Sequence, residues 1–295
     1  LPPLNQADWE SEFALYKASP QYQKVNKGMS LDQFKFIYFW EWFHRLWARL
    51  LGFVFLIPFV YFLVKKMFTR QLMIKAGVAF LLGGLVGIFG WIMVASGLHD
   101  RPMVSPYRLA MHLSLAIITL LYLFWVAMQL LVPKDAHRVS STYRPLRQWG
   151  YALITLVAVQ VIFGALVSGM RAAPFYPTWP DMNGYFIPLA MQEGSNWSLQ
   201  SFLHFDQHPF PAAFVQFVHR NLAYIITVLV VIFLVKGFQT VRTEGTRWAL
   251  RLIPVVLTVQ VLLGIFTLLY TKGSTPVGLG VIHQNVAILL LMSLF

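Results

Sequence analysis

The sequence predicts an all-α integral membrane protein built from two related bundles of helices. Three observations lead to this prediction: a low content of charged residues, seven long apolar stretches, and an internal repeat that places a pair of histidines in each half of the chain. Together they locate the chemistry of the chain within membrane helices, because these stretches leave no room for a soluble catalytic domain.

The composition is that of a protein surrounded by lipid. Of its 295 residues, 58% are hydrophobic and 12% are charged, and the mean hydropathy is +0.62. Soluble domains average about 25% charged residues. The net charge of +12 does not indicate nucleic-acid binding, because Lys and Arg are concentrated in a few loops beside the apolar stretches. The absence of cysteine excludes disulfides and thiolate ligands.

Seven stretches are long and apolar enough to cross a membrane, which takes about 20 residues per helix. We predict spans at 36–64, 72–96, 107–132, 149–170, 211–235, 248–270 and 277–295. The loops after the first, third and fifth spans are basic, and the intervening loops are near neutral. The positive-inside rule therefore places the basic loops in the cytoplasm or matrix, and the segments 1–35 and 171–210 on the outer side.

Both outer segments carry local folding signals. Asn5 is placed to cap a short amphipathic helix that ends near Ala18. Ser30 and Gln33 form a capping-box pattern, which predicts that the first spanning helix begins above the membrane. The loop 171–210 is rich in proline and aromatic residues, which favours a packed cap over a disordered tether.

An internal repeat divides the chain. EWFHRLWARLLG, from Glu41, matches QFVHRNLAYIIT, from Gln216, so that His44 aligns with His219. RLAMHLSLA matches LGVIHQNVA, so that His112 aligns with His283, and the Gly-rich LVGIFG of 85–90 resembles LLGIFT of 262–267. We expect residues 36–135 to form a first half-bundle and residues 136–295 a second, related by a parallel repeat.

The second half has four predicted helices, and the first has three. The unmatched helix is the one that carries GALVSGM, from Gly164. We expect its counterpart to lie upstream of Leu1, which would complete two four-helix bundles, and we expect the last helix to be truncated at Phe295. The alternative is a protein with seven spans.

Four histidines in two matched pairs indicate heme. Ionisable residues inside a membrane are costly and are functional by default. His44, His112 and His219 lie roughly 25–32 Å above the inner ends of their spans, near the outer edge of the hydrocarbon. Zinc prefers four ligands, often Cys or carboxylate, whereas heme needs only axial ligands and a slot between helices. We therefore expect each pair to hold one heme iron.

The residues beside these histidines distinguish the two halves. Arg45 and Arg220 follow the first histidine of each pair and are candidates for binding heme propionates, although snorkelling to the interface is an alternative. Glu41 lies one helical turn outside His44, and its repeat mate is Gln216. A carboxylate in only one half favours a catalytic half and a cofactor half over two electron-transfer hemes.

These residues resemble the heme A synthase family along essentially the whole chain. The likeness rests on EWFHR at Glu41, YRLAMH at Tyr107, GALVSGMRAAPFYPTWPDMNG from Gly164, QFVHR at Gln216 and VIHQN near the end. It implies an eight-helix fold of two four-helix bundles and oxidation of the C8 methyl of heme O to the formyl group of heme A for the terminal oxidase. The lack of cysteine resembles the cysteine-free subtype of mitochondria and many bacteria.

The same resemblance assigns the site residues. His44 and His112 match the residues that hold the substrate heme, and Glu41 matches the essential acidic residue. His219 and His283 match the ligands of a resident heme b. The implied location is the bacterial plasma membrane or the mitochondrial inner membrane, with both heme sites near the outer side.

Two other functions remain open at this stage. One is a diheme b-type electron-transfer subunit, which usually places its hemes at different depths. The other is a heme transport or assembly factor, which would not need Glu41. The expected partners are heme O and lipid, with a heme O-forming enzyme, cytochrome oxidase assembly factors, an electron-transfer protein and a second copy of the chain as candidates, and no nucleic acid.

Overall fold

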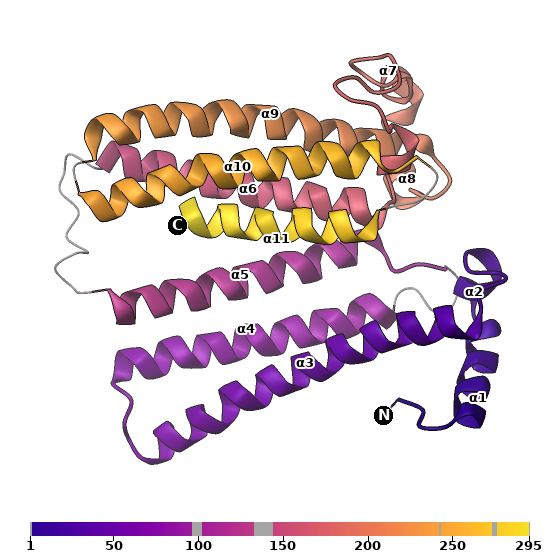
Figure 1. The fold of residues 1–295 in the computed structure, drawn as a ribbon, viewed down its shortest axis with the longest axis horizontal. Coiled ribbons are helices and arrows are strands. Elements are labelled where there is room, and N and C mark those ends of the chain that lie inside the picture. The colour runs from indigo at the N-terminus through magenta and orange to yellow at the C-terminus, as the bar shows by residue number, and fades with distance from the viewer. Residues whose placement is uncertain (1, 96–101, 133–143, 242, 273–275, 295) are drawn as a thin grey trace. The chain divides into compact units, whose positions relative to one another are not determined.

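The computed structural model describes residues 2–95, 102–132, 144–241, 243–272 and 276–294. These residues form helices joined by loops, with a lone β-bridge between Met182 and Tyr185 and no longer strand among them (Figure 1). Among the described residues, seven helices are long and apolar enough to cross a membrane. Both the all-α class and the number of spans are therefore confirmed.

The chain divides into two compact units, Leu1–Leu123 and Phe124–Phe295, here called unit 1 and unit 2. Unit 1 begins with α1 (Gln6–Lys17) and α2 (Pro20–Lys24). Asn5 caps α1 by accepting a hydrogen bond from the Asp8 backbone N–H, as predicted.

The long helix α3 (Leu31–Val64) begins above its apolar stretch, as its capping box predicted. The Ser30 hydroxyl accepts from the Gln33 backbone N–H, and the Gln33 side chain accepts from the Ser30 backbone N–H. Rings of α1 pack on this first part of α3, where the Phe34 ring stacks on Phe13 and Tyr16 at 5.1 and 4.9 Å between centroids. Phe34 is the buried residue of α3.

Unit 1 continues with α4 (Arg70–Ala95) and α5 (Pro106–Leu131), of which the part up to Leu123 belongs to this unit. Two hydrogen bonds tie α5 to α4. Arg108 donates to the Ile92 carbonyl at 3.1 Å, and the Tyr122 hydroxyl donates to the Lys75 carbonyl at 3.1 Å. These bonds join the two helices toward both of their ends.

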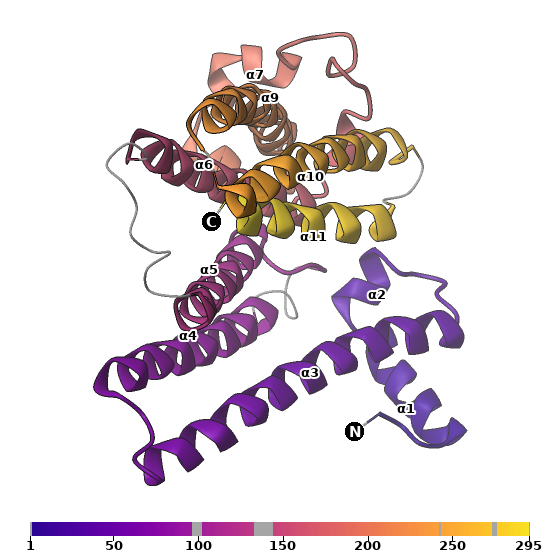
Figure 2. The same cartoon turned by 60° about the vertical axis from the view of Figure 1, so that its left-hand side comes forward.

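Unit 2 contains a closed ring of four long helices. They are α6 (Arg144–Gly169), α9 (Pro209–Thr240), α10 (Glu244–Leu269) and α11 (Val277–Leu294). Each contacts the next, and α11 returns to α6 (Figure 1); Figure 2 shows α10 and α11 side by side. Side chains at the centre of the ring are almost fully buried, among them Leu153, Val230 and Leu291. This arrangement is the four-helix bundle predicted for the second half.

Short helices pack the loop 171–210, which was predicted to lie on the outer side and is here called the outer loop, onto α9. They are η3 (Ala173–Phe175), α7 (Leu189–Gln192), η4 (Gly194–Asn196) and α8 (Leu199–Leu203). Their core is formed by Met191, Phe210 and Ala213, and the Trp197 ring lies 5.0 Å from that of Phe210. The predicted packed cap is thus confirmed, because aromatic burial offsets the entropy of ordering the loop.

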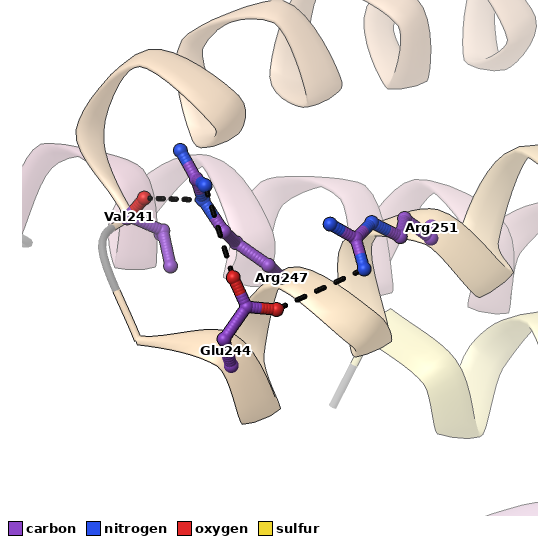
Figure 3. Close-up of polar contacts among 4 residues, drawn as sticks. All are labelled: Val241, Glu244, Arg247 and Arg251. Carbon is purple, nitrogen blue, oxygen red and sulfur yellow. Dashed lines mark hydrogen bonds and ion pairs between the residues drawn. The ribbon is translucent and has the colours of Figure 1, made fainter.

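At the opposite end of α9, Val241 contacts the first turns of α10 (Figure 3). Arg247 Nε donates to the Val241 carbonyl at 3.2 Å, while Glu244 lies 3.9 Å from Arg247 and 3.8 Å from Arg251. The two arginines thus lie near one carboxylate at the start of α10, which the charge pattern places on the inner side.

Candidate functional site

Two histidines face each other inside the bundle of unit 2. His219 lies in the third turn of α9 and His283 in the second turn of α11. Their ring centroids are 6.5 Å apart and their planes are inclined by 76°. A metal bonded to one nitrogen of each ring at about 2 Å would hold the centroids about 6 Å apart, so the spacing suits one metal between two axial imidazoles.

Glycines form a cradle for both rings. A Cβ atom on Gly164 of α6 would lie 3.1 Å from His219 Cε1, and one on Gly264 of α10 would lie 2.9 Å from His283 Cε1. Any larger residue would push the rings out of place. The requirement for glycine is therefore one of close approach rather than of backbone conformation.

Glutamine side chains lie one helical turn before these glycines and touch the same rings. Gln160 Nε2 is 3.4 Å from His219 Nε2, and Gln260 Nε2 is 3.4 Å from His283 Nε2. His283 Nδ1 also lies 3.1 Å from the Gln260 carbonyl oxygen. A hydrogen bond from Nδ1–H to a carbonyl leaves the Nε2 lone pair available, which is the form that a metal-ligating histidine needs.

The donor set fits heme better than a bare metal ion. No group of three His, Cys, Asp or Glu side chains converges among the residues that the structure describes. Two imidazoles in an apolar bundle satisfy the axial positions of heme but leave a zinc ion two ligands short. His219 Nδ1, Gln160 Oε1 and Gln260 Oε1 are buried without a hydrogen-bond partner in the described part of the chain, so polar groups at this point suit a polar ligand group.

Arg220, the neighbour of His219, holds the outer loop. Its guanidinium donates to three backbone carbonyls, those of Tyr176 at 2.5 Å and of Thr178 and Asp181 at 2.7 Å each. Gln216 Nε2 donates to the same Tyr176 carbonyl at 3.1 Å. Both side chains are buried. The predicted contact of Arg220 with a propionate stays a prediction, and within the described structure Arg220 Nε is the buried atom of this side chain without a partner.

The loop segment that Arg220 contacts is a turn, 178–184, held by its own hydrogen bonds. Thr178 donates to Asp181 Oδ1 at 2.8 Å, and the Gly184 N–H donates to the same oxygen at 3.2 Å. These two hydrogen bonds, with the charge of Arg220, hold the pKa of the Asp181 carboxyl below its usual value. Burial raises the pKa of the nearby Tyr176 phenol.

Unit 1 repeats part of the cradle. A Cβ atom on Gly90 of α4 would lie 3.0 Å from His112 Cε1, a distance similar to the 2.9 Å between a Cβ on Gly264 and His283 Cε1. The letter match of LVGIFG to LLGIFT aligned Gly87 with Gly264, and the structure shifts this register by one turn. A Cβ on Gly87 would meet nothing within 4 Å, so Gly90 is the counterpart of Gly264.

His44, Glu41 and Arg45 lie together on α3. His44 is exposed, and it lies near enough to His112 for the charges of the two rings to interact. Arg45 forms an ion pair with Glu41 one turn earlier, and both side chains are more than half exposed. The predicted propionate contact of Arg45 therefore competes with a partner on its own helix.

The sequence argument missed the two glutamines and did not assign the cradle glycines. The signal was present, since VQVIFG at 159–164 and VQVLLG at 259–264 share the pattern Val-Gln-Val-x-x-Gly. Gln160 and Gly164 are four residues apart, as are Gln260 and Gly264, which places each pair on one helix face. A search for repeats centred on histidine passes over these helices because they contain none.

Comparisons with known proteins agree with this arrangement. Proteins named heme A synthase from Nitrosospira multiformis, Flavobacterium psychrophilum and Nitrosomonas eutropha are 43%, 38% and 40% identical to this chain. The alignments cover 98%, 99% and 98% of the chain and 79%, 83% and 79% of the relatives. The sequence profile described as cytochrome oxidase assembly protein matches residues 1–295. The chain therefore belongs to the cytochrome oxidase assembly protein family.

Proposed function

We propose that this chain is a heme A synthase, an oxidoreductase that converts the C8 methyl group of heme O into a formyl group. One observation carries the proposal. Both units place a histidine against a glycine cradle, but unit 1 has a carboxylate, Glu41, one turn before its first histidine, where unit 2 has the amide Gln216. The names of the relatives support the same activity.

In this proposal the two halves divide the work. His219 and His283 hold a resident heme b in the second half-bundle, 136–295, supported by their 6.5 Å ring separation. His44 and His112 hold the substrate heme in the first half-bundle, 36–135. The resident heme supplies electron transfer when it is bound. Both sites lie near the outer side, because the histidines occupy early turns of helices that follow outer loops.

Glu41 is the proposed catalytic acid–base group. Converting a methyl to a formyl group adds one oxygen atom and removes four electrons, which an electron acceptor must take up. The reaction passes through an alcohol and a hydrated aldehyde that loses water. Protons must leave at each oxidation, and a carboxylate beside the substrate can accept them. Arg45 forms an ion pair with Glu41 on the same helix, so a basic group that could bind a propionate lies beside the proposed acid–base residue.

The test is heme extraction from the purified protein. The chain is produced with a heme O-forming enzyme in cells that lack their own heme A synthase, and the extracted hemes are separated by chromatography. We expect heme b together with heme A and traces of the alcohol. Heme b alone, at two per chain, would instead identify a diheme electron-transfer subunit, and unprocessed heme O would identify a carrier.

A further inference from the structure

Arg108 lies one helical turn before His112 on α5, and both side chains reach the same part of α4. Four residues separate them, which is a rise of about 6 Å along one face of the helix. The His112 ring approaches Gly90, while Arg108 donates to the Ile92 carbonyl at 3.1 Å. The Arg108 side chain is exposed, and a guanidinium has more N–H donors than this bond uses. A charged group with capacity for a further acceptor is thus held beside a proposed ligand of the substrate heme.

Unit 2 has no cation at the equivalent position. The alignment of RLAMHLSLA with LGVIHQNVA places Leu279 where unit 1 has Arg108. Leu279 lies four residues before His283, as Arg108 lies four before His112. A leucine offers no donor to an anion. Arg108, like Glu41, is therefore a polar feature of unit 1 that the repeat does not share.

The two differences between the units balance in charge. In unit 2, the residues at the three positions hold one cation and no anion; they are Gln216, Arg220 and Leu279. In unit 1, they hold two cations and one anion; they are Glu41, Arg45 and Arg108. Both sets leave one positive charge. Because Glu41 forms an ion pair with Arg45, the positive charge that remains in unit 1 is that of Arg108.

The substrate of the proposed reaction needs such a charge. Heme O carries propionate carboxylates, and a carboxylate held near hydrocarbon is costly without a partner of opposite charge. A guanidinium matches the planar geometry of a carboxylate and can bind it through two parallel hydrogen bonds.

The place of Arg108 also bears on which methyl group reacts. In heme O the carbon that carries the reacting methyl, C8, is next to a carbon that carries a propionate. Glu41 and Arg108 each lie about one turn before the histidine of their helix, and the charge pattern places the starts of both helices on the outer side. A carboxylate held by Arg108 would therefore bring the neighbouring methyl toward the end of unit 1 where Glu41 lies.

We propose that Arg108 is a substrate-binding residue that holds a propionate of heme O in unit 1 and so directs the C8 methyl toward Glu41. This inference rests on the proposed function in one respect, namely that unit 1 receives heme O. It assigns to Arg108 the carboxylate contact that Arg45, paired with Glu41, is less free to make.

The experiment is a spectral titration of the protein purified from cells that make no heme O. The probes are ferric heme O and its dimethyl ester, which has the same ring and tail but no carboxylate charge. We expect the wild type to bind heme O about 10-fold more tightly than the ester. In Arg108→Gln, which keeps a hydrogen-bond donor but removes the charge, the two affinities should become equal while the affinity for the ester changes little. Arg108→Lys keeps the charge without the fork and should show an intermediate preference.

A matched control separates this role from a purely structural one. Arg70→Gln makes the same chemical change at the exposed start of α4, at the inner end of the helix, and should leave both affinities unchanged. If Arg108 served only to join α5 to α4, its loss would weaken the binding of both probes by the same factor. The preference for heme O over its ester would then stay at its wild-type value.

The outcomes distinguish this inference from the function on which it rests. A wild-type preference in Arg108→Gln, or equal affinities for the two probes in the wild type itself, would overturn the role of Arg108 and leave heme O binding intact. Loss of the preference in Arg45→Gln but not in Arg108→Gln would assign the carboxylate to Arg45 instead. If Arg108→Gln fails to accumulate, the reduced preference of Arg108→Lys is decisive. A heme O signal that persists in His112→Ala would overturn the substrate site of the proposed function.

Discussion

The helices α3 and α9 carry the same motif but use it differently. In α9 the motif residues Gln216 and Arg220 are buried and bind the outer loop, and the whole helix contributes twelve buried residues to its unit. In α3 the matching residues Glu41 and Arg45 are exposed and bind each other. One copy of the motif has become part of a packed structure, while the other keeps its charged groups accessible. This difference is what a cofactor site and a substrate site would require.

Substituting the proposed histidine ligands should give the largest difference in effect between the two units. His219→Ala or His283→Ala should strip the resident low-spin heme, because each removes one of two axial bonds to iron. His44→Ala or His112→Ala should leave that heme in place and abolish heme A formation. The measurements are the optical spectrum of the purified protein and heme extraction. Loss of resident heme from the His44 and His112 variants would mean that the halves are reversed.

Replacing the Glu41 carboxylate by an amide tests whether the difference between Glu41 and Gln216 matters for activity. Glu41→Gln should lower heme A formation about 100-fold or more, since it removes the proton acceptor. Folding should survive, because the lost ion pair is exposed and such pairs contribute about 0–1 kcal/mol. The ratio of heme O, alcohol and heme A is measured at equal protein level. A wild-type yield of heme A would mean that Glu41 is an ordinary surface carboxylate without a catalytic role.

The reciprocal change should act on stability alone. Gln216→Glu places a carboxylate at a buried position where the amide donated to the Tyr176 carbonyl. A deprotonated carboxylate cannot donate, so we expect unit 2 to lose about 1–3 kcal/mol without gaining a second active site. Thermal melting followed by loss of the heme absorbance would measure the effect, and an unchanged melting temperature would contradict it.

The loop contact of Arg220 predicts a large but local effect. Arg220→Ala removes three hydrogen bonds from a charged donor to loop carbonyls and should destabilise the cap by about 2–4 kcal/mol. Limited proteolysis of the loop 171–210 should accelerate. Arg45→Ala is the matched control in unit 1, because its partner lies on its own helix. Equal protection of the loop in the Arg220 variant would show that the aromatic core alone holds it.

The register of the cradle can be tested with pairs of glycines. Gly264→Ala should displace the His283 ring, since its Cβ would lie 2.9 Å from Cε1, and should weaken heme retention about 10-fold through overpacking. Gly280→Ala, with nothing within 4 Å, is the control. In unit 1, Gly90→Ala should impair product formation while Gly87→Ala should not. If Gly87→Ala impaired product formation and Gly90→Ala did not, Gly87 would be the counterpart of Gly264, as the sequence alignment suggested.

The smallest expected effect is the pH response of the outer loop. The pKa of Asp181 is lowered in the folded protein, so its contribution to loop stability is complete above the ordinary pKa of about 3.9 and is lost as the pH falls through the lowered value. Loop proteolysis should therefore be constant near neutral pH and rise only in strong acid. Asp181→Asn should flatten this acid response, and a transition near neutral pH would contradict the assignment.

Much of the fold was predictable because its signals are local. Apolar length gave the seven spans, and caps at Asn5 and Ser30 gave the starts of α1 and α3 within a residue. The pairing of His219 with His283 followed from the repeat. The use of Arg220 and Gln216 was not predictable, because it depends on which loop carbonyls come within reach after folding. Gln160 and Gln260 were missed because a glutamine in an apolar helix has no distinctive spacing until its partner is known.

The contacts of Arg220 have a mechanical consequence. His219 and Arg220 are adjacent on one turn of α9, so the ring that faces the bundle centre and the guanidinium that binds the loop move as a single piece. A protein that docked on this surface and pulled on residues 176–181 would therefore apply force directly to His219, the proposed iron ligand. If a heme is bound there as proposed, its absorbance and redox potential would report on events at the membrane surface without any added label.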